Sequence, residues 1–190
     1  MGLDLVTLAE YKTYAGITST NQDTQIKQLI PIVSQLAKTI CRRTFVDYVS
    51  DAKTEVYSGG MDRLLMSEYP LLSVSGVEYS SDYGATYTSL VEFTDYVVDI
   101  SDGSIAPVQV TEFPKVINGY RVTYNAGFET VPTDLKVAVM DLITYYLKSD
   151  MAVKSQRNAG SNTTQVEFIT KNTLPSHISR VFDLYIATVN

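Results

Sequence analysis

The chain has 190 residues, of which 45% are apolar and 19% are charged; this balance fits one globular domain, or one domain with a sizeable insertion, and excludes a disordered chain. A net charge of −6 argues against affinity for nucleic acid, because phosphate binding depends on clustered Lys and Arg. A single cysteine and a single histidine exclude an internal disulfide and a zinc site built from these residue types.

Membrane insertion and export are not indicated either. No apolar run approaches the roughly 18–20 residues that cross a bilayer. The N-terminal residues Met1 to Asp4 lack the basic segment and the apolar run of a signal peptide. We therefore expect a protein that contacts no membrane and is made in the cytoplasm. The 14 tyrosines suit protein–protein contacts, and outward-facing strand positions are the alternative reading.

The N-terminal segment predicts a short helix over about residues 7–15. Thr7 and Glu10 have the spacing of a capping box, in which each side chain bonds the backbone of the other residue. Gly16 is a suitable C-terminal stop, because glycine adopts the left-handed conformation without a Cβ penalty.

A longer helix is predicted over about residues 23–42. Asp23 is a suitable N-cap, and Pro31 should kink the helix because it removes a backbone donor. Apolar residues recur at helical spacing and form one stripe: Ile26, Leu29, Ile30, Val33, Leu36, Ala37 and Ile40. Cys41 lies on the same face, where we expect a buried thiol and not a reactive one. Arg42-Arg43 at the helix end suits the helix dipole, with a DNA contact as the alternative.

The middle of the chain predicts an antiparallel β insertion over about residues 52–126. Short apolar runs broken by glycine and proline indicate six to eight strands, enough for a sheet or a small sandwich. The clearest runs are residues 54–57, 64–66 and 71–79.

Two hairpins stand out within this insertion. Residues 96–100 should pair with residues 105–110 across a turn-rich tetrapeptide. Asn118-Gly119, between residues 115–117 and 120–124, is the strongest hairpin signal, because both residues tolerate positive φ.

A third helix is predicted over about residues 133–149. This helix is apolar almost all round, so it should be covered on several sides, and a neighbouring subunit could supply part of the cover. Residues 154–165 are polar with little to bury and predict a loop, and residues 166–169 a short strand. Pro175 then opens a last helix, to about residue 188, whose apolar face is Ile178, Val181, Phe182, Tyr185 and Ile186.

Catalytic chemistry is not indicated, and neither a cofactor nor a metal is expected. His177 is the only imidazole and should be an exposed helix residue, far in sequence from Cys41. The chain has no Gly-x-Ser-x-Gly elbow and no phosphate-binding glycine loop. Residues 99–103 do not have the ligand spacing of a calcium loop. A small enzyme that uses carboxylates alone remains the alternative.

The order of these signals resembles the head–tail connector proteins of tailed bacteriophages, also called head-completion or adaptor proteins. The resemblance covers about residues 3–150. Its most specific part is the segment 124–128, Tyr-Asn-Ala-Gly-Phe, which leads into the Pro-Thr-Asp-Leu-Lys of residues 132–136. It implies an α+β fold in which a small helical bundle carries an inserted antiparallel sheet or small sandwich, followed by a C-terminal tail helix.

The resemblance also implies a function in the virion, in the neck that joins head and tail. Such proteins form a ring of about twelve copies beneath the portal protein, extend the DNA channel, and dock stopper or tail proteins. DNA would pass through the lumen without specific binding, and an acidic wall suits such a conduit because it repels phosphates. Assembly would take place in the host cytoplasm.

These expectations divide the chain into a connector domain, residues 1–150, and a flexible link with a C-terminal helix, residues 151–190. We expect the apolar face of that last helix to contact the portal or the adjacent subunit, because a long polar tether lets it reach a neighbour. The competing possibility is that it folds back onto its own bundle. Another neck or tail protein, such as a stopper or a tail-completion protein, is the alternative function, and a β-rich receptor-binding module is a further one.

Overall fold

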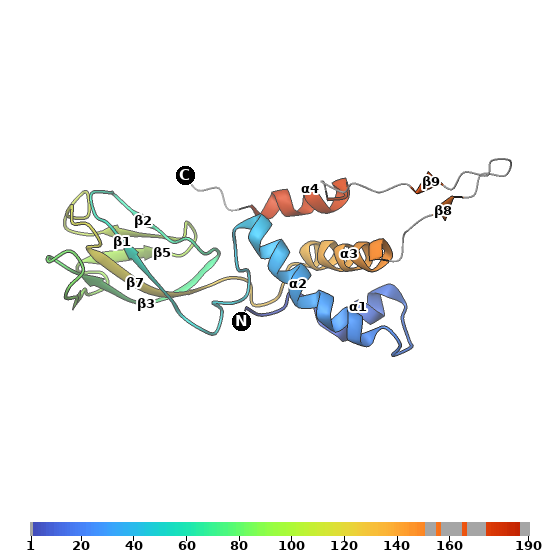
Figure 1. The fold of residues 1–190 in the computed structure, drawn as a ribbon. Coiled ribbons are helices and arrows are strands. Elements are labelled where there is room, and N and C mark those ends of the chain that lie inside the picture. Colours follow the sequence, from blue (N-terminus) through green and yellow to red (C-terminus); the bar gives the residue numbers. More distant parts are fainter. Residues whose placement is uncertain (1, 151–154, 157–164, 167–173, 187–190) are drawn as a thin grey trace. The chain divides into compact units, whose positions relative to one another are not determined.

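The computed structural model describes residues 2–150, 155–156, 165–166 and 174–186. The chain divides into two compact units: a helical unit, residues 1–42 and 132–190, and a β unit, residues 43–131. Both ends of the chain therefore contribute to one unit (Figure 1), and the β unit is an insertion between two pairs of helices. This is the predicted α+β fold.

The first helix, α1 (Leu8–Ala15), confirms the predicted caps. Thr7 Oγ1 accepts the Glu10 N–H at 3.2 Å, and Glu10 Oε2 accepts the Thr7 N–H at 2.7 Å. Gly16 ends the helix in the left-handed conformation with φ 66°. Local chemistry alone determines both ends of this helix.

The second helix is α2 (Asp23–Cys41), and its N-cap residue lies one position before the predicted one. Gln22 occupies the N-cap position, and Asp23 is the first helical residue, where its carboxylate accepts from Lys12 Nζ at 2.7 Å. A carboxylate in the first turn still complements the helix dipole. Most of the predicted stripe is buried, as is Cys41, and Arg42 caps the C-terminus with φ 54°. The buried stripe residues are Ile26, Ile30, Val33 and Ala37, and the half-buried ones are Leu29, Leu36 and Ile40.

The third helix, α3 (Thr133–Asp150), packs against α1, α2 and the last helix, α4 (Ser176–Tyr185). Helices of the same chain thus cover α3 on several sides, and this cover comes without a neighbouring subunit. Its buried residues are Leu135, Ala138, Val139, Met140, Leu142, Ile143 and Leu147.

The β unit is a sandwich of two antiparallel sheets, as predicted. One sheet has the order β1 (Lys53–Tyr57), β7 (Tyr120–Ala126), β3 (Leu71–Tyr79), β4 (Thr88–Ser89), and the other the order β2 (Leu64–Leu65), β6 (Ser104–Pro107), β5 (Tyr96–Asp99). Side chains of both sheets form one core, which includes Leu64, Tyr96 and Ile105 from the second sheet and Val77, Tyr120 and Val122 from the first.

The prediction of a hairpin at Asn118-Gly119 is right about the turn and wrong about the strand before it. Asn118 does adopt positive φ, 53°, in a turn before β7. Residues 115–117, however, form no strand, because β1 and β3 occupy both edges of β7. The other hairpin is confirmed: β5 pairs with β6 in the register Asp99 with Ser104, although β6 ends at Pro107 and not at residue 110.

The segment between α3 and α4 is described only in part. Within it, β8 (Ser155–Gln156) pairs antiparallel with β9 (Gln165–Val166). The rest of the predicted loop over residues 154–165, and of the predicted strand over residues 166–169, lies outside the described residues. No helix in the described part of the chain is both long and apolar enough to cross a membrane.

Candidate interaction surfaces

The predicted contact face of α4 is divided between the core and the surface. Ile178 and Phe182 are 1% and 0% exposed, and α4 packs on α2 and α3 of the same chain. The Cys41 thiol lies 3.6 Å from the Phe182 carbonyl, to which it donates. These two residues therefore do not line a free surface in this structure.

The other three predicted residues remain accessible to different degrees. Val181 and Tyr185 are half-buried, and Ile186 is exposed. The Tyr185 hydroxyl donates to Asp134 Oδ1 at 2.7 Å, which ties α4 to the start of α3. Leu184, which lies off the predicted stripe, is 77% exposed. Contact of this outer side with the portal or an adjacent subunit stays a prediction.

The residues considered for catalysis do not form a site. His177 is exposed, as predicted, and its Nε2 lies 3.7 Å from Asp141 Oδ2. Cys41 is buried, away from solvent. Across the described residues, no group of three or more His, Cys, Asp and Glu side chains is placed to hold a metal ion.

Arg43 has a different role from the one that its position at the helix end suggested. Its guanidinium carbon lies 5.5–5.6 Å from the ring centres of Phe45, Tyr69 and Phe128, and its Nη2 donates to the Tyr69 carbonyl. Three aromatic rings thus hold this cation within the β unit.

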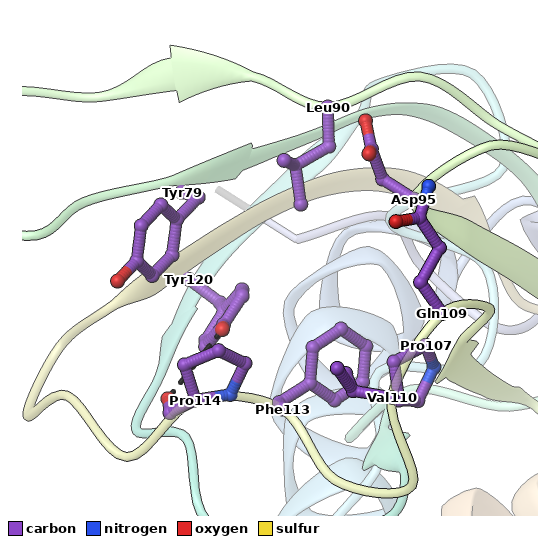
Figure 2. Close-up of a pocket in the computed structure, with 9 residues that line it drawn as sticks. All are labelled: Tyr79, Leu90, Asp95, Pro107, Gln109, Val110, Phe113, Pro114 and Tyr120. Carbon is purple, nitrogen blue, oxygen red and sulfur yellow. Dashed lines mark hydrogen bonds between the residues drawn. The ribbon is translucent and has the colours of Figure 1, made fainter.

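The β unit contains a small apolar pocket of about 210 Å³ (Figure 2), which we call the sandwich pocket. Tyr120 lies between Phe113 and Tyr79, with ring centres 4.8 and 5.2 Å away. Burial, together with Tyr79, raises the pKa of Tyr120 to about 12. The remaining lining residues are Leu90, Asp95, Pro107, Gln109, Val110 and Pro114. The lining is suited to an apolar side chain.

A hydrogen-bonded turn beside this pocket presents a large aromatic side chain to solvent. In this Phe93 turn, residues 91–95, the Val91 N–H donates to Asp95 Oδ2 at 2.8 Å and the Phe93 N–H to the Tyr96 carbonyl at 2.7 Å. Phe93 itself is 77% exposed and has φ 63°. A bulky residue with positive φ is rare and costs free energy, and such strained residues cluster at functional sites. No sequence signal marks this turn.

A polar cluster occupies another part of the sandwich, around Glu55. Glu55 lies opposite Val122, whose side chain is in the core, so the carboxylate points between the sheets. It accepts from Lys53 Nζ at 2.8 Å and from the Tyr124 hydroxyl at 2.7 Å. Further donors are the hydroxyls of Tyr57 and Ser67.

This cluster does not suit carboxylate catalysis. Burial raises the pKa of Glu55, but the bonds from Lys53, Ser67 and the two tyrosines lower it more, to about 2. Burial, with the Glu55 carboxylate, in turn raises the pKa of Tyr57 and Tyr124. A general acid or base works best with a pKa near the working pH. Glu55 is therefore a fixed anion that holds the strands together.

Acid should destabilise the β unit through Glu55. Because its folded pKa, about 2, lies below the ordinary value of 4.5, the stabilisation is complete above pH 4.5 and is lost as the pH falls towards 2. It amounts to about 3 kcal/mol. Urea unfolding at pH 7 and pH 3 checks this: Glu55→Gln should lower stability mainly at pH 7. Glu112→Gln, which alters an exposed carboxylate, should not. An equal loss at both pH values would contradict the assignment.

Charge is distributed unevenly between the two units. The β unit has 13 Asp and Glu against 5 Lys and Arg, a net charge of −8. The helical unit has 8 acidic and 10 basic residues, a net charge of +2. The overall charge of −6 thus conceals two regions of opposite sign, which favour association of unlike surfaces.

The fold and these surfaces define an α+β protein, a helical bundle with an inserted antiparallel sandwich, whose exposed features suit contacts with other proteins. The family model for head completion proteins matches residues 4–187. The chain therefore belongs to the head completion protein family. No curated protein matches it in sequence.

Solved structures share the fold at low sequence identity. A chain in the "Neck of empty GTA particle computed with C6 symmetry" has a TM-score of 0.61 and 14% identity, over 98% of this chain and 91% of that chain. A chain in the "Neck of native GTA particle computed with C12 symmetry" has a TM-score of 0.58 and 14% identity, over 100% and 97%. A third, from the virion of a native gene transfer agent (GTA) particle, has a TM-score of 0.61 and 12% identity, over 98% and 91%.

Proposed function

We propose that the chain is a head–tail connector subunit in the neck of a phage-like virion. The observation that carries this proposal is the family match over nearly the whole chain, together with the shared fold of chains from GTA necks. In this proposal the protein is structural and not an enzyme: it forms a ring beneath the portal protein, extends the channel through which DNA leaves, and docks stopper or tail proteins.

The proposed ring contains about twelve copies. One of the necks that share this fold was computed with C12 symmetry and another with C6 symmetry, and both are compatible with twelve positions. Identical copies close into a ring through a heterologous contact, in which two different surfaces of one chain meet on neighbours. Two units of opposite net charge provide such unlike surfaces.

We further propose that the outer side of α4 contacts the portal or the adjacent copy. Leu184 and Ile186 are exposed there, next to the half-buried Val181 and Tyr185. A partner that covered these residues would extend the apolar face whose inner part, Ile178 and Phe182, is already in the core. Removal of exposed apolar area from water would favour that contact.

Binding to the portal protein of the same particle tests the proposal. The purified chain and portal, mixed and examined by light scattering and electron microscopy, should give a ring of copies on one end of the portal. Leu184→Asp should weaken this binding, whereas Ile32→Asp, at another exposed position of the helical unit, should not. Binding to a tail protein but not to the portal would instead indicate a stopper or tail-completion protein.

A further inference from the structure

We propose that the Phe93 turn of one copy inserts into a pocket on the helical unit of the next copy. This inference rests on the ring proposed above and names the contact that closes it. The turn and the pocket lie on different units of the same chain, so every copy offers both halves of a heterologous contact.

The Phe93 turn has the properties of an anchor. Its backbone is fixed by the bonds of Val91 and Phe93 described above, so little conformational entropy is lost when Phe93 is bound. The Val108 N–H donates to the Asp95 carbonyl at 3.0 Å, which attaches a second exposed apolar segment to the turn. Val91, Phe93, Val108 and Val110 are all at least 45% exposed. Aromatic anchors with an apolar surround are typical of binding hot spots.

The helical-unit pocket has a volume of about 680 Å³ and lies between α1, the link that follows α1, and α3. Tyr11 and Leu147 provide buried apolar surface, and Tyr14 is exposed. The Tyr11 hydroxyl lies 3.0 Å from Thr144 Oγ1. The Tyr14 hydroxyl donates to Asp141 Oδ1 at 2.7 Å, and Asp141 raises the pKa of Tyr14. These bonds hold the wall formed by α1 against α3.

Charge favours this pocket over the sandwich pocket as the site for Phe93. Asp95 lines the sandwich pocket, and Glu92 lies within the turn, so docking one β unit on another would bring like charges together. Each β unit carries −8. The helical unit carries +2, and its pocket is lined by one cation, Lys148, and one carboxylate, Asp141, which accepts from Tyr14. Lys148 can therefore meet Glu92. Docking on the helical unit thus avoids the repulsion between two β units of −8 each.

Two variants separate the halves of the contact. Phe93→Asp removes the anchor, and Ala15→Trp fills the pocket from an exposed position that lines it. Each variant alone should reduce ring formation, with portal present, by about tenfold or more. The matched control is Tyr83→Asp, because Tyr83 is also in the β unit, is 72% exposed and has φ 61°. Its rings should form normally. Circular dichroism and thermal unfolding verify that all three variants are folded.

Mixing the two variants gives the decisive result. The Ala15→Trp chain keeps its Phe93, and the Phe93→Asp chain keeps its pocket, so a mixture retains one contact per pair and should sediment as dimers and not as rings. Rings of normal size from Phe93→Asp would overturn this inference and leave the connector function intact. So would a mixture that contains no pairs. Absence of rings from the unchanged chain with portal would overturn both proposals.

Discussion

Replacing Phe182 with alanine should lower the free energy of unfolding of the helical unit by about 3–5 kcal/mol. Phe182 is completely buried, and α4 packs on both α2 and α3. Removing the ring leaves a cavity that Cys41, whose thiol meets the backbone of Phe182, is too small to fill. The loss is measured by urea unfolding followed by helical circular dichroism.

Leu184→Ala is the matched control for this substitution. Leu184 lies two residues away on the same helix but is 77% exposed, so its removal should change stability by no more than about 0.5 kcal/mol. Truncation after Asp150 extends the test, because it uncovers the faces of α2 and α3 that α4 covers. We expect the truncated chain to unfold or aggregate. A truncated chain that stays folded but no longer joins the neck would show that α4 acts mainly outside its own protomer.

The helices could be predicted from the sequence because their signals are local. The Thr7–Glu10 capping box and Gly16 determine α1 within one residue of its observed bounds. The apolar stripe of α2 is largely buried, and α3 is covered on several sides, as its all-round apolar surface predicted. Such patterns state that a face must be buried but not what buries it. This is why the sequence left two roles open for the last helix; Ile178 and Phe182 are buried and α4 packs on α2 and α3, while contact of its outer side with a neighbour stays a prediction.

Strand pairing was less predictable because it depends on competition between distant segments. Asn118-Gly119 forms a turn, yet the partners of Tyr120 in the sheet are Tyr57 and Tyr79, both more distant along the chain than the residues just before the turn. A local signal cannot show that β1 and β3 already occupy both edges of β7. The same limit applies to the Glu55 cluster, since Ser67 and Tyr124 reach it from other strands and loops. Positive φ at Phe93 likewise has no signature in the residues around it.

Replacing Gly127 with alanine should destabilise the β unit by about 3 kcal/mol or more. Gly127 has φ 115°, a conformation that alanine adopts only with strain, and a Cβ there would lie 2.3 Å from the Phe45 carbonyl oxygen. That oxygen cannot move away without loss, because it accepts the Phe128 N–H at 2.7 Å. The Gly127 N–H is also fixed, by a bond to the Pro70 carbonyl at 2.8 Å.

Gly76→Ala is the control, since it makes the same chemical change in β3, the strand that pairs with β7, which Gly127 directly follows. A Cβ at Gly76 meets no atom within 4 Å, and its φ lies outside the left-handed range. This substitution should be neutral or stabilise by up to about 1 kcal/mol. Thermal unfolding followed by tyrosine circular dichroism compares the two. Equal stability of both variants would contradict the close approach at Gly127. A large loss at Gly127 alone would explain in physical terms why a glycine stands between Ala126 and Phe128, in the segment on which the family resemblance most depends.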